Sequence, residues 1–256
     1  GNGADGGGAD GGGTSDGGDG GSLFPPTPVY AISGTALYQL DTSNSILKNL
    51  GTLSGCNDLV IDIAIDPSGS LYVVTQDGSY RDVASLSMTG VCSGQQTLDS
   101  SHTLSIGYSG TAPANLLELR DDASDLELLD PTDGTDNRLQ GGALPGDAAT
   151  DIACDPTKCW VMVDRSHCTP DPGPGGTCLF DMDTDGSNGA QFRPIAADGL
   201  GGLAYYGKSL YVFSRATPAI HKIDLTSPTA GTVDVSTTGD PRPSAWIGAA
   251  SSSTYP

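Results

Sequence analysis

The chain has 256 residues, of which 36% are hydrophobic and 6% aromatic, and its formal net charge is -20 at pH 7. Its 11 Lys and Arg residues are scattered and form no basic patch, which argues against nucleic acid as a partner. The longest apolar runs fall well short of the roughly 18 residues expected of a membrane-spanning helix.

Residues 1–22 form a Gly- and Asp-rich arm that contains 12 Gly and 4 Asp. Such a segment has almost no apolar surface to bury, so we predict a flexible tether. We place the boundary after residue 27, with an arm over residues 1–27 and a folded domain over residues 28–256. The arm resembles the spacer that follows the lipid-bearing cysteine of bacterial surface lipoproteins, although no such cysteine is present here.

Five short motifs recur along the rest of the chain. Each pairs a long or branched aliphatic residue with Ala or Gly, at Ile63-Ala64, Ile106-Gly107, Ile152-Ala153, Leu203-Ala204 and Ile247-Gly248. They lie 43, 46, 51 and 44 residues apart. A repeat of about 45 residues is typical of a solenoid or a β-propeller. The small residue suits a position where neighbouring sheets crowd around an axis.

Each motif begins a set of predicted strands. Turns such as Asp66-Pro67-Ser68-Gly69 and Asp155-Pro156-Thr157-Lys158 follow two motifs and lead into β-branched and aromatic segments. Asp followed by Pro suits a type I turn, which indicates a hairpin. A third strand ends on Asp in four repeats, at Asp41, Asp130, Asp183 and Asp224. With a weak fourth strand, each repeat matches a propeller blade.

The first and last repeats complete one another. The repeat that begins at Val29 has second, third and fourth strands but no first strand, whereas Ile247-Gly248 supplies a first strand with nothing after it. We therefore predict an all-β fold, a five-bladed β-propeller that the C-terminal strand closes, because closure removes exposed sheet edges. An open stack of five β units is the alternative.

Two runs resemble known families. The run from Asp62 to Val74 is similar to the blade signature of extracellular bacterial propellers of the NHL and gluconolactonase-like group, and the run from Leu179 to Asn188 resembles blades of TolB-type propellers. Those relatives often have six blades, whereas five repeats occur here. The lactonase members hold a channel metal with Glu, Asn and Asp ligands. This sequence does not match that set, so the resemblance implies the fold and not the activity.

Six cysteines without a C-x-x-C motif favour disulfides over zinc or haem. We predict two pairs across short loops and a third by elimination: Cys154–Cys159, Cys168–Cys178 and Cys56–Cys92. Other pairings of six cysteines remain open. Stable disulfides indicate an extracellular or cell-surface protein, with the periplasm as the alternative compartment.

Asp accounts for 29 of the 31 acidic residues. Asp forms turns through its short side chain and also binds hard cations such as Ca²⁺. The run DMDTDGS has the D-x-D-x-D-G spacing of calcium loops, and a second Asp-rich turn precedes it. The candidate calcium ligands are Asp181, Asp183 and Asp185, with Asp130 and Asp133 as a weaker set. Hairpin-turn chemistry is the alternative, because Asp185-Gly186 suits a tight turn.

The remaining polar candidates form no catalytic set. His102, His167 and His221 fall in different repeats at no ligand spacing, and we expect them at the surface. Asp62 and Asp151 occupy equivalent places on two first strands. They either line the axial channel or form hydrogen bonds at the strand ends.

We therefore predict no catalytic residues and no cofactor beyond the candidate Ca²⁺. The expected function is that of a secreted or cell-surface structural or binding propeller within an extracellular assembly. Its partners through residues 1–22 are other copies of itself or another surface protein. One alternative is an extracellular metal-dependent hydrolase or lactonase with its site in the channel. The other is a carbohydrate-binding propeller, but Trp160 and Trp246 lie in predicted strands and leave no exposed aromatic platform.

Overall fold

The computed structural model describes residues 28–56, 59–66, 70–77, 80–98, 103–108, 116–120, 126–139, 144, 149–174, 176–195, 200–227 and 231–251. The predicted arm, residues 1–27, lies outside these residues. Within them the regular structure is strand, apart from one short 3-10 helix, η1 (Arg165–His167). The strands form five sheets.

Four sheets have four antiparallel strands, in chain order from the inner to the outer edge. Sheet 2 contains β4 (Leu59–Ile65), β5 (Leu71–Asp77), β6 (Tyr80–Leu86) and β7 (Cys92–Thr97). Sheet 3 contains β8 (Thr103–Tyr108), β9 (Leu116–Arg120), β10 (Leu126–Leu129) and β11 (Asp136–Arg138). Sheet 4 contains β12 (Ala149–Cys154), β13 (Lys158–Asp164), β14 (Thr177–Asp183) and β15 (Ala190–Ile195). Sheet 5 contains β16 (Leu200–Tyr206), β17 (Ser209–Ser214), β18 (Ile220–Asp224) and β19 (Val233–Asp234).

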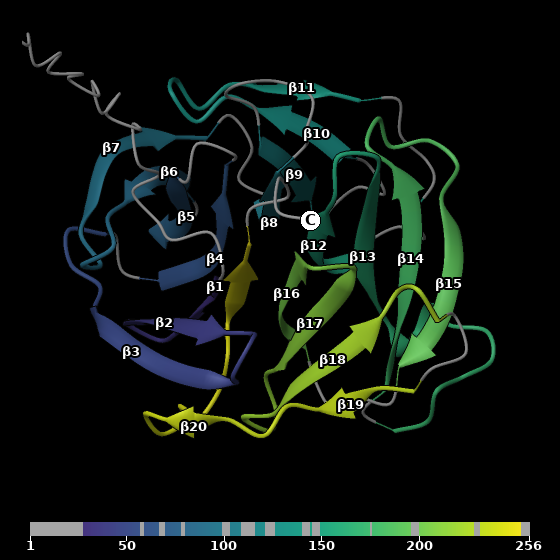
Figure 1. Cartoon of the computed structure of the whole chain (residues 1–256). Coiled ribbons are helices and arrows are strands. Elements are labelled where there is room, and N and C mark those ends of the chain that lie inside the picture. Colours follow the sequence, from purple (N-terminus) through teal and green to yellow (C-terminus); the bar gives the residue numbers. More distant parts are fainter. Residues whose placement is uncertain are drawn as a thin grey trace, which may run out of the picture.

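Sheet 1 is built from both ends of the described chain. Its strands are β1 (Pro28–Ser33), β2 (Ala36–Asp41), β3 (Ile46–Thr52), β20 (Thr238–Gly239) and β21 (Gly248–Ala250). β21 pairs with β1 at the inner edge, and β20 pairs in parallel with β3 at the outer edge (Figure 1). The regular four-stranded blade is thus found four times, and sheet 1 departs from it because β20 adds a fifth strand.

The sheets are arranged like the blades of a propeller, with their inner strands around a common axis (Figure 1). Along the chain, β4 contacts β8, β8 contacts β12, and β12 contacts β16. β21 contacts both β16 and β4. Apolar side chains fill the seams between neighbouring sheets, and five buried clusters account for five such seams. The core therefore lies between the sheets and around the axis.

The recurring motifs lie at this axis. Ile63, Ile152 and Leu203 line a central cavity of about 20 Å³, together with the Ala residue that follows each of them. That volume holds about one water molecule. The fifth inner strand enters the cavity through Ala249 and Ala250, so the prediction of Ile247-Gly248 as the fifth copy is wrong by two residues. Ile247 precedes β21, and its N–H donates to Ile32 O at 2.9 Å.

Both tryptophans lie in seams. Trp160, on β13, stacks on Tyr205 with the ring centroids 5.2 Å apart. Trp246 is fully buried between Tyr38 and Phe213, with edge-on ring contacts at 5.2 and 5.1 Å. It precedes β21 and does not belong to the strand, contrary to the prediction. Neither ring is an exposed platform.

The three predicted disulfides are present. Cys154–Cys159 closes the hairpin between β12 and β13, whereas Cys56–Cys92 joins the segment after β3 to the start of β7. Beside this second bond, Ser54 exchanges backbone hydrogen bonds with Gly90 O and Cys92 N at 2.7 and 2.8 Å. Cys56–Cys92 therefore links sheet 1 to sheet 2.

Candidate functional site

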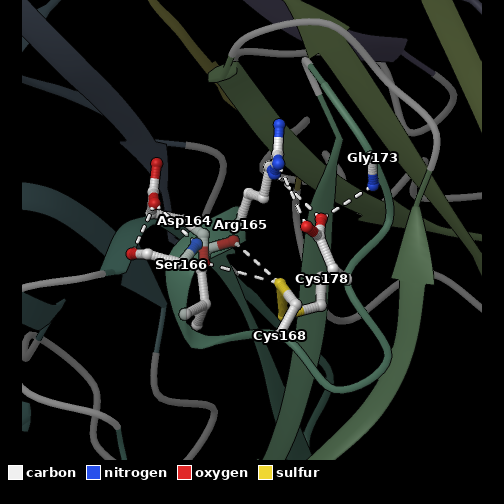
Figure 2. A network of polar contacts seen from close by, with 8 residues as sticks. Asp164, Arg165, Ser166, Cys168, Gly173 and Cys178 are labelled. Carbon is white, nitrogen blue, oxygen red and sulfur yellow. Dashed lines mark hydrogen bonds and ion pairs between the residues drawn. A yellow bond between two sulfur atoms is a disulfide. The ribbon is translucent and has the colours of Figure 1, made fainter.

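The connection between β13 and β14 is the longest between two consecutive strands of one sheet, and it contains a network of polar contacts (Figure 2). We call residues 164–178 the tied loop, because Cys168–Cys178 closes it. At its start Asp164 caps η1, since its Oδ1 accepts from Ser166 N at 2.9 Å and from Ser166 Oγ at 2.7 Å. These bonds lower the pKa of Asp164.

A two-point ion pair spans the tied loop (Figure 2). Arg165 Nη2 lies 3.0 Å from Asp171 Oδ2, and Arg165 Nε lies 2.8 Å from Asp171 Oδ1. The same carboxylate accepts from Gly173 N at 2.8 Å. The bond from Gly173 and then the contact with Arg165 lower the pKa of Asp171. Both side chains are about half exposed, so the pair adds little stability and chiefly sets the shape of the loop.

The outer strand of sheet 4 holds the tied loop from the side. Gln191, on β15, accepts from Thr169 N at 2.8 Å and donates to Thr169 O at 2.5 Å. Thr169, Pro170, Asp171 and Pro174 remain exposed at the tip. A loop with three prolines, a disulfide and paired polar contacts has little conformational entropy to lose when a partner binds. These contacts therefore hold the exposed tip in one shape.

Sequence reasoning found only part of this site. The disulfide of the loop was predicted, but the roles of Arg165, Asp171 and Gln191 were not. The Asp-x-Ser spacing at Asp164 is a local signal for the cap. No local signal pairs Gln191 with Thr169, because β15 brings them together across 22 residues of chain.

The predicted calcium ligands lie at the end of β14 and in the turn that follows it, and each has its own partner. Asp181 Oδ2 lies 2.8 Å from Lys158 Nζ, Asp183 Oδ2 accepts from Asn188 Nδ2 at 2.7 Å, and Asp185 Oδ1 accepts from Ser187 N at 2.9 Å. The contact with Asp181 raises the pKa of Lys158. Within the described residues, no group of three or more His, Cys, Asp or Glu side chains is placed to hold a metal ion. Calcium at this turn stays a prediction.

Asp130 and Asp133 share a pattern with other turns. For six Asp residues in turns or at the cap of η1, Oδ1 accepts from both the backbone N–H and the hydroxyl of a Ser or Thr two residues later. These pairs are Asp41/Ser43, Asp130/Thr132, Asp133/Thr135, Asp155/Thr157, Asp164/Ser166 and Asp224/Thr226. Such bonds lower the pKa of Asp41, Asp133 and Asp224. Turn chemistry of this kind explains why Asp, and not Glu, recurs after the third strands.

The two inner-strand aspartates are buried and hydrogen-bonded. Asp62 Oδ2 accepts from Ile106 N at 3.0 Å, which ties sheet 2 to sheet 3. Asp151 Oδ1 accepts from Ile152 N at 2.7 Å. Each lies at an irregularity in the pairing of its inner strand with the next strand. Of the two predicted roles, the structure supports hydrogen bonding, but at irregularities within the strands and not at their ends.

The histidines differ from one another. His167 is exposed, as expected, and His102 lies outside the described residues. The side chain of His221 is 13% exposed, so this residue lies only partly at the surface. Its Nδ1 lies 2.6 Å from Asp234 Oδ1, because β18 and β19 pair at these two residues.

Comparison with solved structures supports the propeller fold. A chain in the crystal structure of the nidogen/laminin complex is similar with a TM-score of 0.53 and 14% sequence identity, over 87% of this chain and 97% of that chain. A protein of unknown function from Bacteroides caccae has a TM-score of 0.48 and 9% identity, over 88% of this chain and 98% of its own. At this identity the first similarity shows the fold alone.

The sequence matches no protein-family model and no curated protein. The described residues contain no helix with the length and apolar character needed to span a membrane. Three disulfides are consistent with an extracellular protein.

Proposed function

We propose that this chain is an extracellular binding propeller that recognises a protein partner through the tied loop. The observation that carries the proposal is the two-point contact between Arg165 and Asp171 within a loop that Cys168–Cys178 closes. Together they hold an exposed tip in one shape before any partner arrives, which lowers the entropic cost of binding. The nidogen chain that shares the fold was crystallised in a complex with laminin, which makes a protein partner a reasonable first choice.

The packing around the central axis favours a binding function over catalysis in the central channel. Aliphatic residues, including Ile63, Ile106 and Leu203, line the central cavity, and about 20 Å³ leaves no room for a substrate. No observation among the described residues favours the metal-dependent hydrolase or lactonase.

The proposal includes a closed ring of five blades. Sheet 1 acts as the fifth blade, with β21 supplied by the C-terminal part of the chain. The contacts of β21 with β4 and β16, and the apolar clusters in the seams on both sides of sheet 1, support closure. The sequence resemblance to NHL, gluconolactonase-like and TolB-type blades remains part of the proposal.

Residues 1–22 add an assembly function to the proposal, with another copy or a second surface protein as partner. Deletion of these residues tests it through light scattering of the purified protein and through surface attachment in cells. We expect smaller particles or loss of attachment. Unchanged mass together with unchanged attachment would overturn the role of the arm.

The tied loop is tested by a double variant, Thr169→Lys with Pro174→Lys, which alters the exposed tip without touching the disulfide or the ion pair. A matched control places the same charges at Thr52 and Ser93, which are exposed on sheets 1 and 2. Immobilised wild type, tip variant and control are exposed to proteins released from the surface of the source cells. A partner retained by wild type and control but lost by the tip variant supports the proposal, and equal retention by all three contradicts it.

A further inference from the structure

A second pocket lies between the outer parts of sheets 5 and 1. It is at the opposite end of the strands from the tied loop. Its volume is about 380 Å³, within the range of sites for small molecules. Its lining consists of Thr42, Ser45, Tyr211, Lys222, Val233, Asp234, Val235 and Ser236. These residues come from the turn between β2 and β3 and from the outer part of sheet 5. We call it the seam pocket.

Strand register builds the floor of the seam pocket. Tyr211, Lys222 and Val233 lie side by side on β17, β18 and β19. Burial raises the pKa of Tyr211, so its phenol stays neutral and can both donate and accept hydrogen bonds. Lys222 Nζ lies 5.9 Å from the centroid of the Tyr211 ring. In the described part of the chain no carboxylate lies within ion-pair distance of this ammonium group.

The far wall of the seam pocket is held in place before a ligand binds. Asp234 is paired with His221 at 2.6 Å, and Arg242 Nη2 donates to Val235 O. The chain then continues to Thr238, whose N–H donates to Ser45 O at 3.0 Å. This bond joins the far wall to the near wall of a pocket that is open to solvent.

The lining selects a chemical class. Lys222 only donates hydrogen bonds, Asp234 only accepts them, and the hydroxyls of Thr42, Ser45, Tyr211 and Ser236 do both. Sugar hydroxyls likewise donate and accept, and the C–H groups of a sugar ring suit Val233 and Val235. An anion is less suitable, because Asp234 lies in the pocket and Asp224 interacts electrostatically with Lys222. A wholly apolar ligand would leave the Lys222 ammonium group without a hydrogen-bond partner in the pocket.

We propose that the seam pocket binds one uncharged sugar residue. This site is separate from the tied loop. It needs no exposed aromatic platform, because the side chains that the paired strands and the pocket walls present would contact the sugar. Expected ligands are neutral monosaccharides or the ends of neutral glycans. The hydrogen bonds come from Lys222, Asp234 and the surrounding hydroxyls, and the apolar contacts come from the two valines.

The experiment uses the whole chain and saturation-transfer NMR with methyl glycosides of glucose, galactose, mannose and N-acetylglucosamine, with glucuronate as an anionic probe. Lys222→Gln removes the positive charge of the central donor, and Lys48→Gln removes the same charge from an exposed position on β3 outside the pocket. Ser236→Trp fills the pocket from its rim. Tryptophan fluorescence and circular dichroism verify that each variant keeps the fold.

We expect at least one neutral glycoside to bind wild type and Lys48→Gln equally. Lys222→Gln should bind it about tenfold more weakly, because the charge-assisted hydrogen bond from the ammonium group is lost. Ser236→Trp should abolish binding. Absence of any neutral glycoside signal with wild type overturns the proposal. Three other results would also overturn the proposal. These are equal binding by both Lys variants, unaltered binding by Ser236→Trp, and tighter binding of glucuronate than of every neutral probe.

Discussion

Gly248 offers the most direct test of the seam between sheets 1 and 2. A Cβ at this position would lie 2.2 Å from Asp62 Oδ1 and 2.9 Å from Asp62 Cα. Both distances are too short for real contacts, and Asp62 is buried, with its other oxygen accepting from Ile106 N at 3.0 Å. The substitution Gly248→Ala must therefore either separate β21 from β4 or displace the carboxylate from its hydrogen bond.

The expected cost follows from these two routes. Overpacking of a buried contact costs about 1–3 kcal/mol, and a hydrogen bond to a buried charged group contributes about 1.5–3 kcal/mol. Replacing Gly by Ala also restricts the unfolded chain, which returns about 0.4–1 kcal/mol. We expect Gly248→Ala to lower the free energy of unfolding by about 2–4 kcal/mol.

The assay is guanidinium unfolding with the disulfides intact, followed by the fluorescence of the buried Trp160 and Trp246. Gly231→Ala is the matched control, because a Cβ there meets no heavy atom within 4 Å. We expect the control to stay within about 0.5 kcal/mol of wild type. In an Asp62→Ala background the penalty of Gly248→Ala should shrink, since the carboxylate is gone.

Equal stability of Gly248→Ala and Gly231→Ala would refute the reasoning. It would mean that β21 does not pack against β4, and the proposed closure of the ring would lose its support. A full penalty that persists in the Asp62→Ala background would place the strain on the Asp62 backbone instead of its side chain.

Three further predictions concern charge, metal and disulfide. Hydrogen bonds hold the pKa values of six aspartates below their usual 3.8: Asp41, Asp133, Asp164, Asp171, Asp185 and Asp224. Their contribution to stability is therefore complete above pH 3.8 and is lost as the pH falls through the lowered values. Acid unfolding followed by circular dichroism should show this loss, and a loss of stability that begins near neutral pH would contradict it. If the turn at Asp181–Asp185 binds Ca²⁺, added calcium raises the melting temperature and Asp185→Ala removes the increase; a melting temperature indifferent to calcium and to chelator rejects this site. Replacement of Cys56 and Cys92 by Ser should cost about 2–4 kcal/mol, measured by guanidinium unfolding, and an unchanged midpoint would show that the bond does not fasten sheets 1 and 2.

Several features could be predicted from the sequence because they depend on neighbouring residues. Turns that contain Asp-Pro or Asp followed by Ser or Thr form through local hydrogen bonds, and the strands between them are short segments rich in β-branched and aromatic residues. The hairpin disulfide Cys154–Cys159 follows from the same locality. The period of the repeat then indicates a propeller, since one such sheet cannot bury its own apolar faces.

The tertiary structure decided how the sheets meet. Which small residue faces the axis depends on the crowding of five inner strands, and so Ala249, and not Ile247, completes the central layer. The parallel pairing of β20 with β3 has no local signal, because Thr238 and Ile46 are far apart in the chain.

The tied loop and the seam pocket also depend on contacts between segments that are distant in the chain. Cys168 and Cys178 could be paired from the sequence, but Gln191 reaches the tied loop only through the register of β15. The seam pocket combines Ser45 with Lys222, and only the packing of sheet 1 beside sheet 5 brings them together. By itself the sequence determined the strands, their turns and the disulfides, because local chemistry governs them; the tertiary structure decided the seams and both sites, because these depend on contacts between segments distant in the chain.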